Sequence, residues 1–96
     1  MKCIDHYAPP TPADLSRLKD QLGFTSEQMA RLAGLAQGGQ WRKYTGTQTP
    51  RVMGQHMHFY MAALLTLPPD QLERVFDCMR EQGANLNVGN LEAPRT

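Results

Sequence analysis

Apolar side chains recur every three or four residues along much of the chain, which is the period of an amphipathic helix. The first such run places three apolar side chains on one face: Leu15, Leu18 and Leu22. Thr11 suits the N-cap, Pro12 the first helical position, and Gly23 the residue after the last turn. We therefore predict a first helix that begins at Pro12 and ends before Gly23, after an extended arm of residues 1–10.

Two shorter helices are predicted next, joined by a tight turn. Thr25 or Ser26 caps the first of them, and its buried side chains are Met29, Leu32 and Ala33. Gly34 allows the left-handed backbone of the turn, and Leu35 anchors the turn to the core. The second short helix is predicted over residues 36–44, although Gly38 and Gly39 each weaken it by up to ~1 kcal/mol relative to Ala.

The longest and most hydrophobic helix is predicted over residues 51–67, where Pro68-Pro69 ends it. Its apolar positions are Met53, Met57, Tyr60, Met61, Leu64 and Leu67. A last helix opens at Pro69-Asp70 and stops near Gly83. Its apolar stripe either completes the core or forms a twofold dimer contact, and consists of Leu72, Val75, Phe76 and Met79. Residues 84–96 are rich in Asn, Gly and Pro, which predicts a flexible tail.

Composition places these five helices in one small domain. The 96 residues, 41% of them apolar, fit a single core, and we predict an all-α domain over residues 11–83. Cys3 and Cys78 lie far apart without a metal or redox spacing, which is typical of a reduced cytoplasmic protein. Neither a secretory signal nor a transmembrane run of about 20 apolar residues is present. The net charge of +1 is no nucleic-acid signal by itself, so DNA binding depends on where the charges lie.

Residues 24–46 resemble the helix-turn-helix of the Cro and phage-repressor superfamily, the xenobiotic-response-element-type (XRE) regulators. The matching positions are Phe24, Thr25, Ser26, Glu27, Met29, Ala30, Gly34, Leu35 and Gly46. The motif covers about a quarter of the chain, and the order of the helices extends the likeness to residues 13–67. The resemblance implies a five-helix lambda-repressor-like fold whose second short helix enters the major groove of DNA.

The second short helix departs from the family pattern. The family has an aliphatic anchor near Gln40 and an acidic residue near Tyr44, whereas this chain has Trp41 as its bulky residue, one place later. Either the helix starts late, after Gly38-Gly39, or its face is rotated relative to the common pattern.

The resemblance directs a group of polar and aromatic side chains to DNA. These are Thr25, Ser26, Gln37, Gln40, Trp41, Arg42, Lys43 and Arg51. Gln37 and Arg42 suit base reading, because Gln pairs with adenine through both amide groups and Arg pairs with guanine. Lys43 and Arg51 suit phosphates, as do hydroxyls at a helix start. The alternative for the polar set is a solvated helix face, and for Trp41 it is packing in the core.

Other chemistry is weakly indicated. His56 and His58 are two residues apart, which directs them to different faces of a helix rather than to one metal ion. The sequence shows no catalytic triad, phosphate-binding loop or paired carboxylates, so we expect neither an enzyme nor a bound metal or cofactor.

These patterns lead to a functional hypothesis and one alternative. The first is a sequence-specific transcription regulator, a homodimeric repressor of bacterial or phage origin that binds a palindromic operator in double-stranded DNA. The alternative is a protein-interaction module on the same fold that does not bind DNA, such as an antitoxin or an inhibitor of a host protein.

Overall fold

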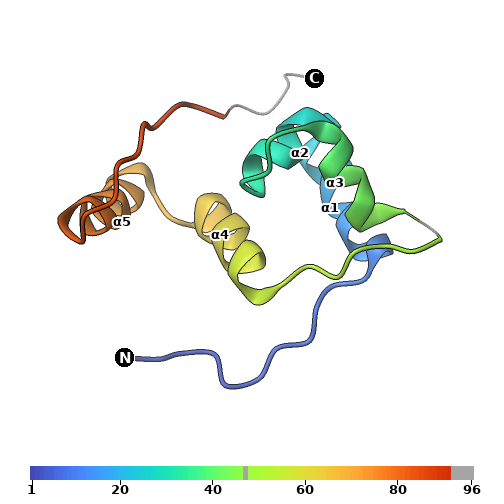
Figure 1. Ribbon diagram of the computed structural model, residues 1–96, viewed down its shortest axis with the longest axis horizontal. Coiled ribbons are helices and arrows are strands. Elements are labelled where there is room, and N and C mark those ends of the chain that lie inside the picture. The colour runs from blue at the N-terminus through green and yellow to red at the C-terminus, as the bar shows by residue number, and fades with distance from the viewer. Residues whose placement is uncertain (47, 92–96) are drawn as a thin grey trace.

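The chain forms five α-helices, seen in a computed structural model that describes residues 1–46 and 48–91 (Figure 1). The helices are α1 (Pro12–Leu22), α2 (Ser26–Leu32), α3 (Gly38–Thr45), α4 (Gln55–Thr66) and α5 (Pro69–Glu81). No strand occurs among the described residues, which confirms the all-α prediction. The first three helices pack together, α4 packs on α2, and α5 lies at the end of the molecule farthest from α3.

α1 has the boundaries that its sequence predicts. The Thr11 hydroxyl accepts a hydrogen bond from the Asp14 backbone N–H, and the Asp14 carboxylate accepts one from the Thr11 N–H at 2.9 Å. The hydrogen bond from the Thr11 N–H is the main reason that the pKa of Asp14 lies below its usual value, and the side chains of Thr11 and Arg17 lower it further. Gly23 ends the helix with φ at 69°, a left-handed conformation that costs glycine little.

α2 is built by the same local devices. Thr25, rather than Ser26, is the N-cap, and it exchanges two hydrogen bonds with Gln28. At the other end Gly34 has φ at 75°, and the Leu35 N–H donates to the Ala30 carbonyl at 2.7 Å. This bonding closes the tight turn that the sequence predicts.

Two helices begin later than their sequences suggest. α3 begins at Gly38 instead of Ala36, because the N–H groups of Ala36 and Gln37 donate to the Gln40 side chain outside the helix. It therefore includes both glycines rather than starting after them. α4 begins at Gln55 instead of Arg51, and residues 51–54 before it are not helical.

The core lies among α1, α2, α3 and one side of α4. Its buried side chains are Leu15, Phe24, Met29, Ala30, Leu32, Ala33, Trp41, Tyr44, Met53 and Met61. α5 contributes no buried residue, so in the single chain its stripe does not complete the core, which is one of the two roles that the sequence left open for it. The radius of gyration of 14.3 Å exceeds the ~12.5 Å of a compact chain of this length, because α5 and the N-terminal arm stand away from the core.

Among the described residues, the segments before α1 and after α5 form neither helix nor strand. In the arm, the Tyr7 hydroxyl donates to the Met53 carbonyl at 3.0 Å and lies 3.3 Å from His58 Nδ1. Burial raises the pKa of Tyr7. In the predicted tail, Leu91 packs against the core. The rest of that tail, residues 92–96, and Thr47 of the polar loop lie outside the described residues.

Candidate nucleic-acid interface

α3 has one buried face and one exposed face. Trp41 and Tyr44 lie in the core, three residues apart, and hold the helix against α2 and α1. Gln37, Arg42 and Lys43 are exposed. A helix anchored by aromatic side chains on one face presents its basic side chains in a defined direction on the other.

The structure corrects the assignment of Trp41 to DNA contact. Its side chain is 0% exposed, and its ring centroid lies 6.4 Å from that of Tyr44. A fully buried indole cannot stack on a base or a sugar without unfolding of α3. Trp41 therefore belongs to the core.

A carboxylate from α2 holds the start of α3. Glu27 Oε1 accepts a hydrogen bond from the Gly38 N–H at 2.9 Å. A Cβ on Gly38 would lie 2.5 Å from that oxygen and 3.1 Å from the Glu27 backbone nitrogen, so the two helices approach as closely as a glycine allows. Gly38 thus sets the position of α3 against α2.

Gln40 also serves the start of α3 rather than its exposed face. Its Oε1 accepts hydrogen bonds from the N–H groups of Ala36 and Gln37, at 2.9 and 3.1 Å. Pairing with adenine through both amide groups requires that oxygen to be free. The arrangement therefore contradicts Gln40 as a bidentate base reader and makes it a capping residue. Gln37 and Arg42 keep exposed side chains.

The remaining candidates lie at the two ends of the α2–α3 pair. The Arg51 N–H donates to the Lys43 carbonyl at 2.8 Å, so this bond brings the loop residue beside the C-terminal end of α3. Thr25 is exposed and Ser26 half-buried at the start of α2. The Thr25 N–H is already bonded to Gln28, which leaves the Thr25 hydroxyl hydrogen as its donor to a ligand.

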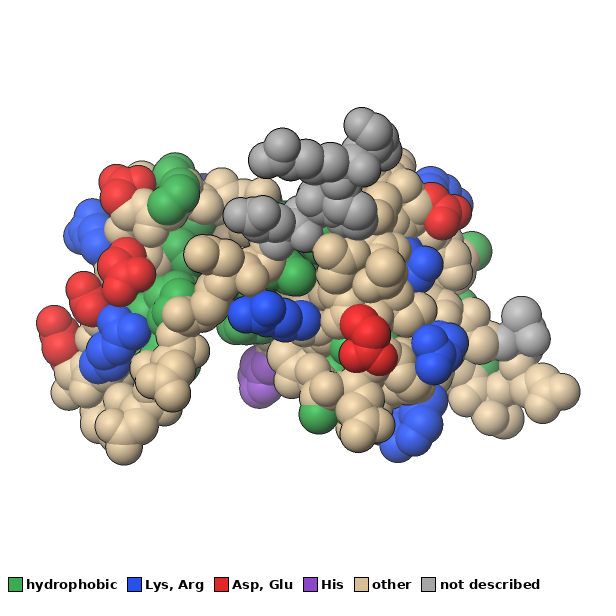
Figure 2. Space-filling view, turned by 90° about the horizontal axis from the view of Figure 1, so that it is seen from above, with side chains coloured by type: hydrophobic (Ala, Val, Ile, Leu, Met, Phe, Trp, Pro, Cys, Tyr) green, Lys and Arg blue, Asp and Glu red, His purple; other side chains and the backbone are tan. Residues whose placement is uncertain are grey.

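The near-neutral total charge hides an uneven distribution. No Asp or Glu lies between Glu27 and Asp70, a stretch that contains Arg31, Arg42, Lys43 and Arg51. α5 has four acidic and two basic side chains, a net charge of −2. Figure 2 shows the acidic side chains of α5 on the lobe at the left, and Lys and Arg predominate on the rest of the face in view. The ion pairs of the described residues involve only α1 and α5, so none of them joins Arg42, Lys43 or Arg51 to a carboxylate.

Sequence reasoning missed Glu27 as a structural determinant of this surface. Its partner, Gly38, is 11 residues away along the chain. No local spacing rule joins a carboxylate on one helix to the first amide of the next. The pair of glycines is the only signal, since a glycine at a helix start often marks a close approach of another segment.

Within residues 1–46 and 48–91, no three His, Cys, Asp or Glu side chains gather in a way that suits a metal ion. Among the helices described, none is long and apolar enough to span a bilayer. No protein-family model, curated protein or solved structure matches the chain.

The close approach at Gly38 leads to a paired prediction. We expect Gly38→Ala to lower the free energy of unfolding by about 1–2 kcal/mol, because the added methyl group displaces the Glu27 carboxylate and crowds the backbone of α2. Gly39→Ala is the matched control, because its Cβ meets only the tip of Arg42 at 3.7 Å. It should raise the stability by up to about 1 kcal/mol through helix propensity. Urea unfolding of both variants tests this, and equal effects would contradict the proposed packing.

Proposed function

We propose that the protein is a sequence-specific DNA-binding regulator that inserts α3 into the major groove. The observation that carries this proposal is the exposed face of α3, where Arg42 and Lys43 lie opposite a buried aromatic anchor, with Gln37 exposed at the N-cap of the helix. An α-helix fits the major groove, and amide and guanidinium groups are the side chains that read base edges there.

The distribution of charge supports the same proposal. The long stretch without acidic residues includes α3 and the loop that follows it. Lys43 and Arg51 are joined through a backbone hydrogen bond at one end of the helix, so both cations can lie beside one phosphate backbone. Local positive charge of this kind supplies most of the affinity of a DNA-binding protein.

The packing of α3 supports specificity rather than mere attraction to phosphate. The carboxylate of Glu27, the amide oxygen of Gln40 and the buried Trp41 hold the helix start and its inner face in one position. Direct readout of bases requires side chains held in a defined geometry. By its resemblance to the Cro and phage-repressor superfamily, we further propose that the protein represses transcription as a homodimer on a palindromic operator.

The test is a binding titration against duplex DNA at several salt concentrations. The duplexes are the DNA upstream of the protein's own gene and a pool of random sequence, from which preferred sites are selected. We expect affinity to fall steeply as salt rises, because bound cations release condensed counterions from the phosphates. Lys43→Ala or Arg51→Ala should lower the slope of log K against log salt by about 1 each.

A matched control and a clear negative outcome complete this experiment. Arg74→Ala on α5 removes the same charge as Arg51→Ala but far from α3, and it should leave the slope unchanged. Failure of the wild-type chain to bind any duplex would overturn the proposal. That result would favour the alternative of a protein-interaction module.

A further inference from the structure

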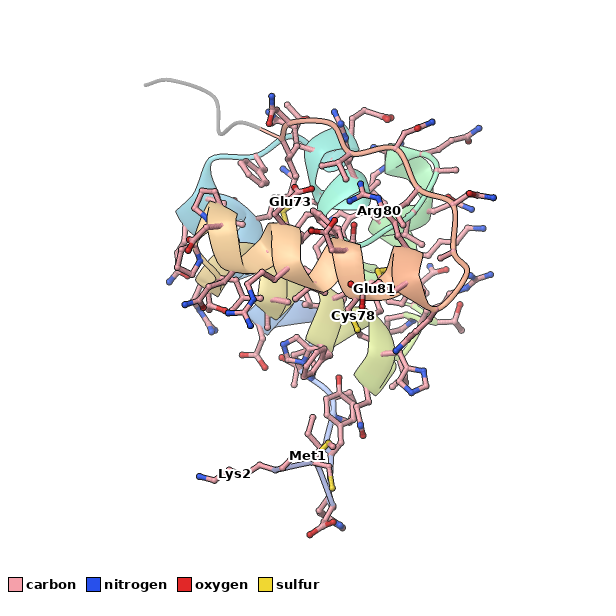
Figure 3. The ribbon with its side chains drawn as sticks, turned by 90° about the vertical axis from the view of Figure 1, so that its left-hand side faces the viewer. Met1, Lys2, Glu73, Cys78, Arg80 and Glu81 are labelled. Carbon is pink, nitrogen blue, oxygen red and sulfur yellow. The ribbon has the colours of Figure 1, made fainter. Side chains whose placement is uncertain are left out.

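A groove of about 630 Å³ separates α5 from the rest of the molecule. α4 and α5 form its walls, and α2 and the segment of residues 86–91 border it. Its apolar lining from α4 and α5 includes Tyr60, Leu64, Leu65, Leu72, Phe76 and Met79. Figure 2 shows the molecule hollowed between the α5 lobe and the body, and Figure 3 looks onto the outer side of α5, where Glu73, Arg80 and Glu81 are labelled.

Both walls of the groove are more apolar than a solvent-exposed surface requires. α4 contains no Asp, Glu, Lys or Arg, and yet Phe59 is 65% exposed and Leu65 is 42% exposed. Residues 59–65 of α4 are all apolar, and a helical segment that is apolar on all sides is normally buried on all sides. On α5, Val75 and Met79 are exposed although they belong to the apolar stripe of a strongly amphipathic helix. The two helices therefore lack part of their packing in the single chain.

We propose that this groove is filled by α5 of a second copy of the chain. In the pair, α5 of each protomer lies between α4 and α5 of its partner around a twofold axis. The α4 and α5 helices of both protomers then form one four-helix cluster. The inference deepens the homodimer of the proposed function, and it rests on that function only for the twofold symmetry that a palindromic site requires.

Self-complementarity favours a second copy over another occupant. In a twofold dimer both protomers use the same surface. α5 can take both roles, because it lines the groove of its own protomer and presents an apolar stripe that the groove of the partner can accept. The charges agree as well. Two charged side chains of the described residues line the groove, Arg31 on α2 and Glu73 on α5 itself, and α5 as a whole carries a net charge of −2. An entering α5 therefore brings acidic side chains toward Arg31 of the body.

Large apolar side chains that line the groove leave much of their area in water. Four of them are between 42% and 48% exposed: Tyr60, Leu65, Met79 and Val88. At ~200 Å² for a fully exposed large side chain, they leave on the order of 350 Å² in water. A standard interface buries about 800 Å² on each partner, so these residues supply somewhat less than half of it. The half-buried residues of the groove can supply much of the rest.

The experiment is sedimentation of the full chain, without DNA, over a wide range of concentrations. The wild-type chain should sediment as a dimer that dissociates on dilution. Met79→Glu on one wall and Leu65→Glu on the other should each raise the dissociation constant of the dimer by about 30-fold or more, because each places an unpaired carboxylate in an apolar contact. Both side chains are partly exposed in the single chain, so its own fold should tolerate the change.

Two controls separate loss of the dimer from loss of the fold. Arg74→Gln makes the same change in net charge on the opposite face of α5, and it should leave the dissociation constant within about twofold of the wild type. Trp41 is the only tryptophan and is fully buried, so its fluorescence reports whether the core of each variant is intact.

Each outcome decides the inference. A wild-type chain that stays monomeric at every concentration overturns it, and so does a dimer that persists in both glutamate variants. Dissociation in Met79→Glu and Leu65→Glu but not in Arg74→Gln supports it. If the chain dimerises through the groove but binds no duplex, only the proposed DNA-binding function fails. If it binds DNA as a monomer that never dimerises, the groove inference and the proposed homodimer fail, and the proposal of DNA binding stands.

Discussion

Replacing Trp41 with alanine should lower the free energy of unfolding by about 3–5 kcal/mol. The indole is 0% exposed and joins α3 to the core, so its removal leaves a large cavity beneath the helix. Small domains are stable by only about 5–15 kcal/mol, so this one change removes a large part of the total. We therefore expect the melting temperature to fall strongly and the surface of α3 to lose its order in this variant.

Urea and thermal unfolding followed by far-UV circular dichroism measure this effect, because the variant no longer has its tryptophan reporter. Trp41→Phe is the control. The Trp41 Nε1 is buried and has no hydrogen-bond partner in the part of the chain that the structure describes, so phenylalanine removes an unsatisfied donor while it keeps an aromatic ring. Its cost should be at most about half that of alanine, because loss of an unpaired N–H offsets part of the lost packing. Unchanged stability in Trp41→Ala would show that the indole is not a core anchor.

Replacing Arg42 with alanine should weaken binding to a selected operator by about 10- to 100-fold, the range expected for one guanidinium that reads a base. Arg42 is exposed on α3, and none of the ion pairs among the described residues involves it. It should therefore act on binding with little effect on the fold. Loss of a base-reading contact should also relax the sequence preference at one position of each half-site.

The measurement compares wild-type and variant chains on the wild-type operator and on single-base variants of it, at one salt concentration. Arg74→Ala on α5 is the control for loss of a positive charge, and it should keep both affinity and sequence preference. If Arg42→Ala and Arg74→Ala weaken binding equally, the attraction is general and α3 does not read bases. If Arg42→Ala weakens binding to all sequences alike, the side chain binds phosphate instead.

The sequence predicted those features that depend on neighbours along the chain. Thr11 and Thr25 each cap a helix through a residue three places later, and Gly23 and Gly34 close turns through bonds within a few residues. Such contacts form wherever the local sequence occurs, so spacing alone locates them. The exposure of Arg42 and Lys43 also follows from the helical period, once Trp41 is taken as the buried side. Gln37 is exposed for another reason, because it is the extended N-cap that precedes the helix.

The start of α3 could not be predicted in this way. Its first amide bonds to Glu27 on another helix, and the amides before it bond to Gln40, so the helix begins at Gly38. The family resemblance likewise directed Gln40 to DNA, whereas the folded chain uses its oxygen as a cap. A polar side chain with two available roles takes the one for which its neighbours in space supply partners.

By itself, the sequence determined the number of helices, most of their ends, and which side of α1, α2 and α3 is buried, because capping and helical periodicity act over a few residues. Only the tertiary structure decided the two questions on which function depends. It placed Trp41 in the core rather than at a ligand, and it left the apolar stripe of α5 facing an open groove. Both depend on contacts between segments distant in the chain, because burial of an apolar side chain is a property of what packs against it, not of its own helix.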